Sequence, residues 1–465
     1  MQLIKRIILC VVALVAVCVA QGQGRNLSSF AGRWWLAMLE EASLPMNLTF
    51  VENDTAVIPQ LYSPMQSHQP IPISKWTYKN DSLTIQAKSI GLKLSLLWNR
   101  NDSTFNGAFR QGLLKAQMHF LPSKELFKLN RPQEPHPPYP YSEEEVSVDC
   151  GNGVIISGTL TRPGGNGKTP AVLLITGSGA QNRDEEIMGH KPFLVLADFL
   201  TRNGIAVLRY DDRGTARSTG NFSSATSLDL AEDAEQMFEW LRKQNGIDPK
   251  HVGLIGHSEG GLIGPMIAAR NKNVAMVVLL AGPGYSGEEI LMQQNRRIFE
   301  LQGAEDSLIS IRLACLKDLF EACRDTSSAN QKLYRNIIEK HTQKLDKSQC
   351  DKIALHPRDS YSWWQQLAAP WMQTFLDIDP KEYLPMVRCP ILALGGEKDS
   401  QVLARENLES IRELTHNKAE IHILPQLNHL FQHCDTGLSN EYMLIEETLS
   451  IEALELIKKF IEKHS

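Results

Sequence analysis

The sequence predicts an α/β fold in which most strands of the main sheet are parallel. Short apolar runs recur between Ala171 and Leu424, and stretches with helical periodicity separate them. Near-continuous apolar strands that alternate with helices are typical of a parallel sheet buried on both faces. The alternation stops between Ala281 and Pro380, and the residues before position 131 read instead as short antiparallel strands. We therefore expect a small antiparallel β domain, followed by an α/β domain with a helical cap inserted into it.

Six apolar runs are the expected strands of the parallel sheet. They cover residues 171–175, 205–208, 251–255, 274–280, 390–394 and 421–424. Between the second and third runs, Thr226 can cap a helix, because Asp229 lies three residues further on and apolar side chains then recur at helical spacing. The first domain is expected to contain strands at residues 48–51, 83–86 and 92–96 and a polar turn at residues 79–81.

Composition divides the chain into segments. Residues 1–20 are expected to be a signal peptide, 26–130 the antiparallel β domain, 131–144 a proline-rich linker and 145–465 the α/β domain, with the cap at about 285–380. The linker marks a boundary because its prolines cannot sit inside a helix or a sheet. The cap contains Trp363, Trp364 and Trp371, which are candidates for lining a substrate pocket and also ordinary core residues.

The first residues have the pattern of a secretory signal. Lys5 and Arg6 precede an apolar run from Ile7 to Val19, and the run closes with Ala20. The run is shorter than the roughly 20 residues that cross a bilayer, so we expect cleavage after Ala20 and not a membrane anchor. The mature protein is then expected to be secreted or periplasmic, with no stable membrane insertion.

Charge and cysteine content exclude some classes of function. The mild net charge of -5 indicates no concentrated basic face for nucleic acid. Without the expected leader, six cysteines remain, at positions 150, 315, 323, 350, 389 and 434. Six thiols allow about 15 disulfide connectivities, and the close spacing within residues 315–350 makes a bridge there one candidate. No paired CxxC spacing is present, so we expect neither a metal nor a cofactor.

The strongest chemical signal is the sequence Gly-His-Ser-Glu-Gly-Gly at residues 256–261, which contains a G-x-S-x-G motif. It follows the apolar run that ends at Ile255 and precedes a helical stretch that runs to Arg270. In this context the serine sits on a sharp strand-to-helix turn, and glycines flank it because side chains there would collide. The free N–H groups at the start of the helix favour negative charge near the serine. We therefore identify Ser258 as the candidate nucleophile.

A serine nucleophile needs a base and an acid that orients the base. Asp399 and His429 each follow one of the expected strands, in the chain order serine, acid, histidine. Both then lie at the carboxyl ends of parallel strands, where sites on open sheets form. Glu397 is the alternative acid. The alternative bases are His257, which points away from the serine, and His433, which is expected at the surface.

Two backbone N–H groups are expected to hold the oxyanion that forms when the serine attacks a carbonyl. One is the N–H of Glu259, at the start of the helix. The other comes from the loop Thr-Gly-Ser-Gly-Ala at residues 176–180, where two glycines allow a close backbone approach. Within this loop the Ser178 N–H is preferred and the Gly179 N–H is the alternative.

Charged residues close to the expected site are further candidates for substrate binding. Arg183, Asp211 and Arg213 lie in two loops that follow strands, and an arginine there can hold a carboxylate or phosphate through two hydrogen bonds. The alternative is that these residues form ion-paired turns that support the site. Together with Glu259, they are also the candidate anchors for the terminus of a peptide substrate.

The motifs resemble the α/β-hydrolase superfamily. The resemblance is carried by Leu-Ile-Thr-Gly-Ser-Gly at 174–179, Leu-Arg-Tyr-Asp-Asp-Arg-Gly at 208–214, the serine motif at 256–261, Gly-Gly-Glu-Lys-Asp-Ser-Gln-Val at 395–402 and Leu-Asn-His-Leu-Phe at 427–431. Within the superfamily the chain is similar to exported bacterial serine hydrolases that carry a small β domain in front. That group includes carboxylesterases and peptidases, so the resemblance implies transfer of an acyl group to water. Thr176 stands where members often have a histidine.

The residues and the resemblance together predict a secreted serine hydrolase that cleaves carboxylic esters through an acyl-enzyme. Esters with small or medium acyl groups, including carbohydrate and phenolic esters, are the expected substrates. A serine peptidase or aminopeptidase with the same triad is the first alternative, and a non-catalytic binding protein on a hydrolase scaffold is the second. The expected partner is a small-molecule ester, and the front β domain is a candidate surface for a homodimer.

Overall fold

The computed structural model describes residues 27–39, 44–53, 56–64, 69–112, 114–165, 167–324 and 330–465. The expected signal peptide, with Cys10 and Cys18, lies outside the described residues. The chain forms two compact units, which join between Asn130 and Arg131. Within the described ranges, no helix is long and apolar enough to cross a membrane.

The first unit is built on an antiparallel sheet of eight strands in the order β3-β2-β1-β8-β7-β6-β5-β4. The elements are η1 (Ser28–Phe30), β1 (Trp34–Leu39), β2 (Leu44–Glu52), β3 (Val57–Tyr62), β4 (Lys75–Lys79), β5 (Ser82–Ala87), η3 (Lys88–Ile90), β6 (Leu92–Asn99), β7 (Thr104–Gln111) and β8 (Leu114–Ser123). The expected runs at 48–51, 83–86 and 92–96 lie in β2, β5 and β6. The prediction of an antiparallel β domain is confirmed.

Alternating burial explains why these short segments form strands. Leu83 and Ile85 in β5 and Leu94 in β6 are buried, and the residues between them are more exposed. This pattern is typical of a sheet with one face on a core and the other in water. Between β4 and β5, Asn80 and Asp81 have φ angles of 52° and 61°. The expected polar turn is therefore a two-residue hairpin of the kind that matches the twist of its strands.

The second unit contains a mixed sheet of eight strands in the order β16-β15-β14-β13-β11-β12-β10-β9. The strands are β9 (Ser142–Asp149), β10 (Ile155–Arg162), β11 (Thr169–Ile175), β12 (Ala206–Tyr210), β13 (Ile247–His257), β14 (Val277–Leu280), β15 (Ile391–Gly396) and β16 (Glu420–Leu424). Neighbours from β12 across to β16 are parallel, and β10 runs antiparallel to both β12 and β9. The prediction of a mostly parallel sheet is confirmed. The β9–β10 hairpin was not predicted, because β9 carries mainly polar, exposed residues.

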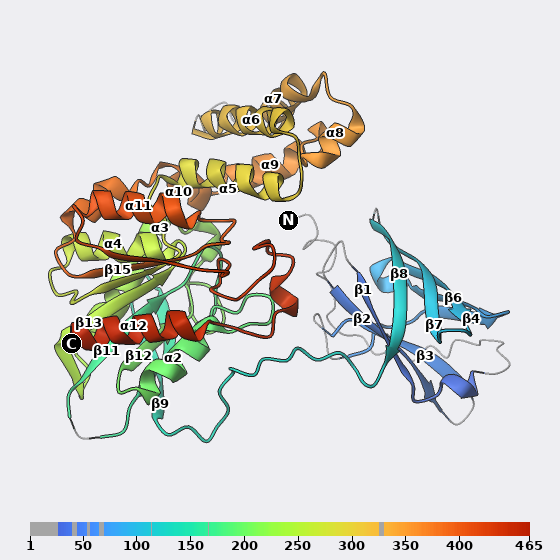
Figure 1. The fold of residues 1–465 in the computed structure, drawn as a ribbon, viewed down its shortest axis with the longest axis horizontal. Coiled ribbons are helices and arrows are strands. Elements are labelled where there is room, and N and C mark those ends of the chain that lie inside the picture. The colour runs from blue at the N-terminus through green and yellow to red at the C-terminus, as the bar shows by residue number, and fades with distance from the viewer. Residues whose placement is uncertain are drawn as a thin grey trace. The chain divides into compact units, whose positions relative to one another are not determined.

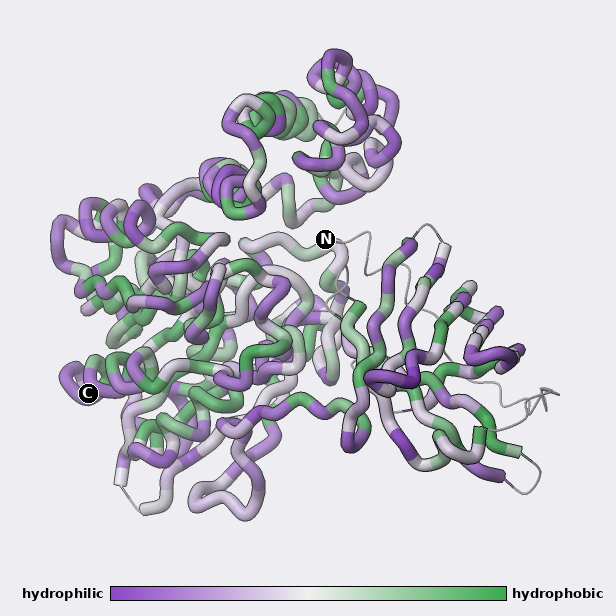
Figure 2. Tube along the Cα trace, turned by 45° about the vertical axis from the view of Figure 1, so that its right-hand side comes forward, coloured by the Kyte–Doolittle hydropathy of each residue, from purple (hydrophilic) through white to green (hydrophobic). Residues whose placement is uncertain are grey.

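Helices cover both faces of this sheet (Figure 1). They are α2 (Pro192–Arg202), η4 (Phe222–Ser224), α3 (Ser227–Arg242), α4 (Gly260–Arg270), α11 (Ala404–Leu414), η8 (Tyr442–Leu444) and α12 (Ile451–Lys463). α2 and α12 pack on one face, and α3, α4 and α11 pack on the other. Thr226 accepts a hydrogen bond from the N–H of Asp229, which accepts one in return, so α3 has the expected capping box. The strands between the helices form a largely hydrophobic interior (Figure 2).

The expected cap is present as a helical insertion between β14 and β15 (Figure 1). Its elements are α5 (Gly287–Leu301), α6 (Asp306–Arg324), α7 (Gln331–Thr342), α8 (Lys347–Lys352), η5 (Pro357–Asp359), α9 (Ser360–Leu367) and α10 (Pro370–Asp377), followed by η6 (Pro380–Glu382) and η7 (Leu384–Met386). The cap has an apolar core of its own, with Leu319 and Tyr334 fully buried. Trp363 and Trp364 pack against this core, whereas Trp371 packs against the core of the sheet.

All six cysteines outside the expected leader are free thiols. The candidate bridge within residues 315–350 is therefore not formed, although Cys315, Cys323 and Cys350 are all buried. Cys315 and Cys323 lie on the same helix, α6, eight residues apart. At about 1.5 Å of rise per residue their backbones are roughly 12 Å apart, which is too far for a disulfide bond.

The proline-rich linker is bound to the second unit. The guanidinium group of Arg131 donates hydrogen bonds to the carbonyl groups of Met188, Gly189, Met443 and Ile445. One side chain therefore joins the loop that precedes α2 to the loop that precedes α12. The second unit accordingly begins at residue 131, and its first strand begins before the expected boundary at residue 145.

We predict that Gly260→Ala destabilises the second unit by about 2 kcal/mol or more. A Cβ at this position would collide with the backbone carbonyl oxygen atoms of Ile175 and Thr176, which cannot rotate away. Gly264→Ala in the same helix is the matched control, because a Cβ there lies 3.4 Å from Val277 Cγ1, an ordinary contact. Thermal unfolding followed by circular dichroism compares the two variants, and equal melting temperatures would contradict the prediction.

Candidate active site

The backbone holds Ser258 at the bend between β13 and α4. Its φ angle is 53°, in the left-handed region that a non-glycine residue seldom adopts and that costs about 1–3 kcal/mol. The Ser258 N–H donates to the carbonyl of Leu280 on the neighbouring strand at 2.8 Å, and the Ser258 carbonyl accepts from the N–H of Gly261 at 2.8 Å. A Cβ at Gly256 would overlap the carbonyl group of Gly260. The bend is therefore as tight as the motif predicts.

His429 and Asp399 form a buried hydrogen-bonded pair. The imidazole Nδ1 lies 2.7 Å from Asp399 Oδ2, and both side chains are almost completely buried. Asp399 Oδ1 accepts the N–H groups of Gln401 at 2.7 Å and Val402 at 2.9 Å. These backbone donors fix the carboxylate, and the carboxylate in turn fixes the ring, which leaves Nε2 as the ring nitrogen able to accept a proton.

The loop of His429 is bound to the residue that precedes the serine. His257 Nε2 donates to the His429 carbonyl oxygen at 3.0 Å, and the centroids of the two rings are 4.9 Å apart. Ser258 Oγ and the His429 ring are not hydrogen-bonded to each other in this structure. In enzymes without substrate such contacts are often long and shorten when substrate binds.

The alternative acid and bases have other partners. Glu397 is exposed and accepts the N–H of Gln426 at 3.0 Å. His433 is exposed and contacts Glu447 at 2.8 Å. His257 lies 2.9 Å from Glu185 Oε1. The His429 ring is therefore paired with Asp399 and not with the alternative acid Glu397.

The loop after β11 passes directly beside the serine. A Cβ at Gly177 would lie 3.2 Å from Ser258 Cβ, so only glycine allows this approach without displacement. The Gly177 N–H donates to Glu185 Oε1 at 2.7 Å. Gly179 has a φ angle of 103°. The loop that carries the two candidate oxyanion donors, Ser178 and Gly179, is thus held beside Ser258.

A buried carboxyl group, Asp212, holds the same loop from the other side. Its Oδ1 accepts from Thr176 Oγ1 at 3.0 Å and its Oδ2 accepts the Gln181 N–H at 2.9 Å. Burial raises the pKa of Asp212 to about 8, and the nearby carboxyl groups of Glu259 and Glu185 add to the rise, although these hydrogen bonds oppose it. Thr176 therefore serves to anchor the loop.

The charged candidates for substrate binding are paired within the chain. Arg183 forms a bidentate ion pair with Asp211, at 2.7 and 3.2 Å, and also contacts Glu145 at 2.9 Å. Arg213 is bound to Asp233, at 2.6 and 2.9 Å. These contacts favour the alternative interpretation, in which the residues form ion-paired turns that support the site.

The side chain of Glu259 is buried, with 1% of its surface exposed, although its neighbour is the candidate nucleophile. Its Oε1 accepts from Ser227 Oγ at 2.5 Å and from Trp371 Nε1 at 2.8 Å. Burial raises the pKa of the Glu259 carboxyl, and these hydrogen bonds oppose that rise. Because Trp371 belongs to α10, this contact joins the cap to the residue whose N–H is a candidate oxyanion donor. Among the described residues, that N–H has no hydrogen-bond acceptor.

Sequence reasoning missed three side chains of the site: Glu185, Asp212 and, as a partner of Glu259, Trp371. Glu185 and Asp212 lie in loops and Trp371 lies in the short helix α10, so no periodic spacing marks them. Their roles follow from contacts with other segments of the chain. The available signal for Asp212 was a charged residue close to the end of a buried strand, since β12 ends at Tyr210. Within the described ranges, no group of three or more His, Cys, Asp or Glu side chains could hold a metal ion.

A strained serine at a strand-to-helix bend and an orienting Asp–His pair, carried by a mostly parallel sheet, place the chain among the serine hydrolases of the α/β-hydrolase class. Within this class, the chain also matches the model of one family. Residues 152–431 match the model of the family described as X-Pro dipeptidyl-peptidase (S15 family), and they make up more than half of the chain. The chain therefore belongs to this family.

Similar proteins include enzymes with esterase in their names. Esterase EstD from Thermotoga maritima is 29% identical over 297 residues, which are 63% of this chain, and the chain spans only 61% of the length of that esterase. A solved esterase of Pyrococcus furiosus aligns with a TM-score of 0.43 and 16% identity, over 73% of this chain and 99% of that one. Est1E from Butyrivibrio proteoclasticus, solved with ferulic acid bound, aligns with a TM-score of 0.42 and 17% identity, over 69% of this chain and 98% of that one.

We predict that Asp212→Asn changes how stability depends on pH. The pKa of Asp212 is about 8 in the folded chain against an ordinary 3.8, so between these values the folded state binds more protons than the unfolded state. Stability contributed by this group is therefore fully present below about pH 4 and is lost as the pH rises towards 8, by up to about 1.4 kcal/mol per pH unit.

Asparagine cannot ionise, and its amide can bond both Thr176 Oγ1 and the Gln181 N–H. Relative to wild type, Asp212→Asn should be more stable near pH 8 than near pH 5. Urea unfolding at the two pH values measures this difference. Parallel pH dependences of the two proteins would show that Asp212 does not carry the proton.

Proposed function

We propose that this chain is a carboxylesterase that works through an acyl-enzyme on Ser258. The observation that carries the proposal is the 2.7 Å contact between His429 Nδ1 and the buried Asp399 carboxylate, beside the loop of a strained serine. Such a pair gives the imidazole one free nitrogen and stabilises the positive charge that it acquires. This is the chemistry that an unreactive serine hydroxyl requires.

In the first half-reaction, Ser258 Oγ attacks the acyl carbon of the ester and gives its proton to His429 Nε2. The oxyanion of the tetrahedral intermediate is held by the N–H of Glu259 and by that of Ser178 or Gly179. The bond from the acyl carbon to the leaving oxygen then breaks, and His429 donates its proton to the departing alcohol. Asp399 remains ionised throughout and stabilises the imidazolium form.

In the second half-reaction, water replaces the alcohol. His429 accepts a proton from water, whose oxygen attacks the acyl carbon, and the same N–H groups hold the second oxyanion. The bond to Ser258 Oγ breaks, the imidazolium returns its proton to the serine, and the carboxylic acid leaves. The cycle consumes one water molecule and needs no cofactor.

Esters are the favoured substrate class for two reasons. Esterase EstD, a relative at 29% identity, carries that activity in its name. In addition, Arg183, Asp211 and Arg213, three of the four candidate anchors for a peptide terminus, are already engaged in ion pairs within the chain. The acyl groups expected are small or medium, including those of carbohydrate and phenolic esters.

A peptidase is the second candidate function, since the family is described as X-Pro dipeptidyl-peptidase. Peptidases that release short peptides need a charged group to bind the substrate terminus. Glu259 is the remaining candidate of the four, because its Oε2 has no hydrogen-bond partner among the described residues. Its complete burial disfavours this role unless the cap moves and Trp371 releases it.

We predict faster hydrolysis of p-nitrophenyl esters than of aminoacyl arylamides. An ester needs only the nucleophile, base and oxyanion donors, whereas an aminoacyl substrate also needs a free anchor for its amine. Values of kcat/KM for the two substrate series, measured on the full chain, make the comparison. Strong arylamide turnover with negligible ester hydrolysis would assign the chain to the peptidases, and failure of a fluorophosphonate probe to label Ser258 would indicate a binding protein.

We predict that Ser258→Ala and His429→Ala each reduce kcat by about 10³-fold or more. The double variant should lose little more than either single variant, because the two residues act as one unit. Asp399→Asn should cost a comparable or smaller factor, because the nucleophile and the oxyanion donors remain. Steady-state kinetics on wild type and the four variants measures the factors, and a double variant with the product of both losses would contradict the shared mechanism.

A further inference from the structure

A buried side-chain pair, Glu185 and His257, joins the two loops that must meet at the serine. Glu185 Oε1 accepts the Gly177 N–H of the loop after β11 at 2.7 Å, and it lies 2.9 Å from His257 Nδ1. On its other side, His257 Nε2 is 3.0 Å from the carbonyl oxygen of His429. The chain of contacts therefore runs from the oxyanion loop, through two side chains, to the backbone of the catalytic base.

The positions of the hydrogens follow from the partners. A carbonyl oxygen only accepts, so His257 Nε2 must carry a hydrogen. Glu185 Oε1 receives the Gly177 N–H, which favours the carboxylate form, and His257 Nδ1 then donates to the same oxygen. Burial alone lowers the pKa of His257, but the carboxylate of Glu185 and the carbonyl of His429 together raise the pKa above its ordinary value. The contacts thus describe an imidazolium–carboxylate pair.

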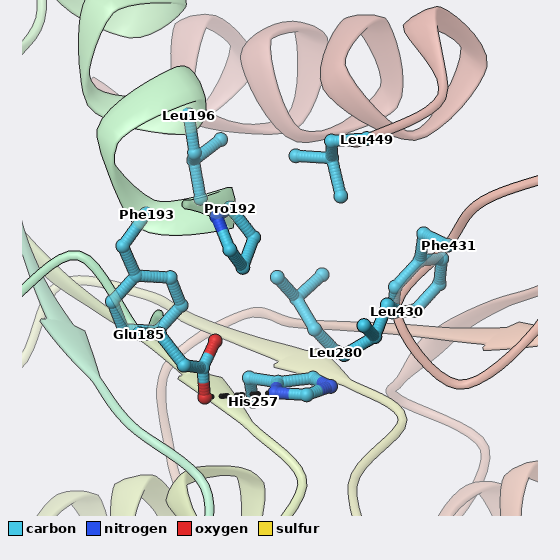
Figure 3. Close-up of a pocket in the computed structure, with 9 residues that line it drawn as sticks. All are labelled: Glu185, Pro192, Phe193, Leu196, His257, Leu280, Leu430, Phe431 and Leu449. Carbon is cyan, nitrogen blue, oxygen red and sulfur yellow. Dashed lines mark hydrogen bonds and ion pairs between the residues drawn. The ribbon is translucent and has the colours of Figure 1, made fainter. Parts of the chain in front are cut away.

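The surroundings of the pair are apolar. Figure 3 shows Phe193, Leu280 and Phe431 beside the dashed Glu185–His257 contact. The cavity that these residues line measures about 10 Å³, room for at most one water molecule. Glu185 is 1% exposed and has a φ angle of 52°, so the backbone is held in a left-handed conformation that directs this side chain inward. Loss of one partner would leave the other buried and unpaired in these apolar surroundings.

We propose that Glu185 and His257 are positioning residues that set the oxyanion loop and the catalytic histidine in register with Ser258. Neither side chain contacts substrate or the reacting atoms. Glu185 acts by fixing the Gly177 peptide, which precedes the candidate oxyanion donor Ser178. His257 acts by fixing the carbonyl of His429, and hence the ring. This role rests on the proposed function, since it requires Ser258 to be the nucleophile.

Two substitutions of His257 separate the two arms of the contact. In His257→Gln the amide nitrogen takes the place of Nε2, so the bond to His429 is retained and the bond to Glu185 is lost. In His257→Asn the amide nitrogen takes the place of Nδ1, so the bond to Glu185 is retained and the bond to His429 is lost. Glu185→Gln keeps an acceptor for the Gly177 N–H but removes the charge. Glu186→Gln is the matched control, because Glu186 is an exposed carboxylate on the same turn.

Kinetics with p-nitrophenyl acetate, affinity for a trifluoromethyl ketone and melting temperature are measured on all variants. We expect Glu185→Gln and both His257 variants to lower kcat by about 10- to 100-fold with KM within about threefold of wild type. Glu185→Gln and His257→Gln should also weaken trifluoromethyl ketone binding by about the factor lost in kcat, because that adduct occupies the oxyanion hole. Glu186→Gln should match wild type in every measurement.

Folded variants that keep the wild-type kcat would overturn the positioning role. A loss of kcat that the unfolded fraction of the variant fully explains would overturn it too. If Glu185→Gln does not fold, the two His257 variants decide the question alone. Labelling of wild type by a fluorophosphonate probe separates this inference from the proposed function. A labelled wild type with unaffected variants overturns the positioning role only, whereas an unlabelled wild type overturns the function and the role together.

Discussion

The bend that carries Ser258 depends on backbone atoms approaching more closely than any side chain permits. A Cβ at Gly256 would overlap the carbonyl group of Gly260, and one at Gly260 would overlap the carbonyl of Ile175 on β11. Backbone atoms on three elements therefore fill the space that side chains would occupy. This packing keeps Ser258 in its left-handed conformation, and the positions of the loops after β11 and β16 are defined relative to it.

Buried carboxyl groups then hold the loops around the bend. Asp399 orients the His429 ring, Glu185 and Asp212 bind the loop after β11, and Glu259 binds the cap. Each accepts hydrogen bonds from backbone N–H groups or from side chains of a different element. In a low-dielectric interior such bonds are strong, and an unpaired group is costly. The site is therefore rigid because its charged groups are enclosed, and the same enclosure raises the pKa of Asp212 and of Glu259.

The cap and the first unit extend this hydrolase core in different ways. The cap has its own hydrophobic core and contacts the site through hydrogen bonds from Trp371 to Glu259 and from Gln294 to Gln401. A movement of α10 would therefore change a hydrogen bond of Glu259, the residue that follows Ser258. The first unit is an antiparallel sheet whose core is independent of the catalytic unit. Its candidate role as a homodimer surface stays a prediction. Function within this fold class is set by such additions more than by the sheet itself.

The sequence by itself determined the features that depend on short spacing: the apolar strands, the capping box at Thr226 and the bend at Ser258. These features follow from local sterics and periodicity, which neighbouring residues specify. Only the tertiary structure decided the long-range partners. His257 meets Glu185 from 72 residues away and His429 from 172, and the β9–β10 hairpin joins a mostly parallel sheet. No local pattern encodes such contacts, because burial and partner identity arise only when distant segments pack together.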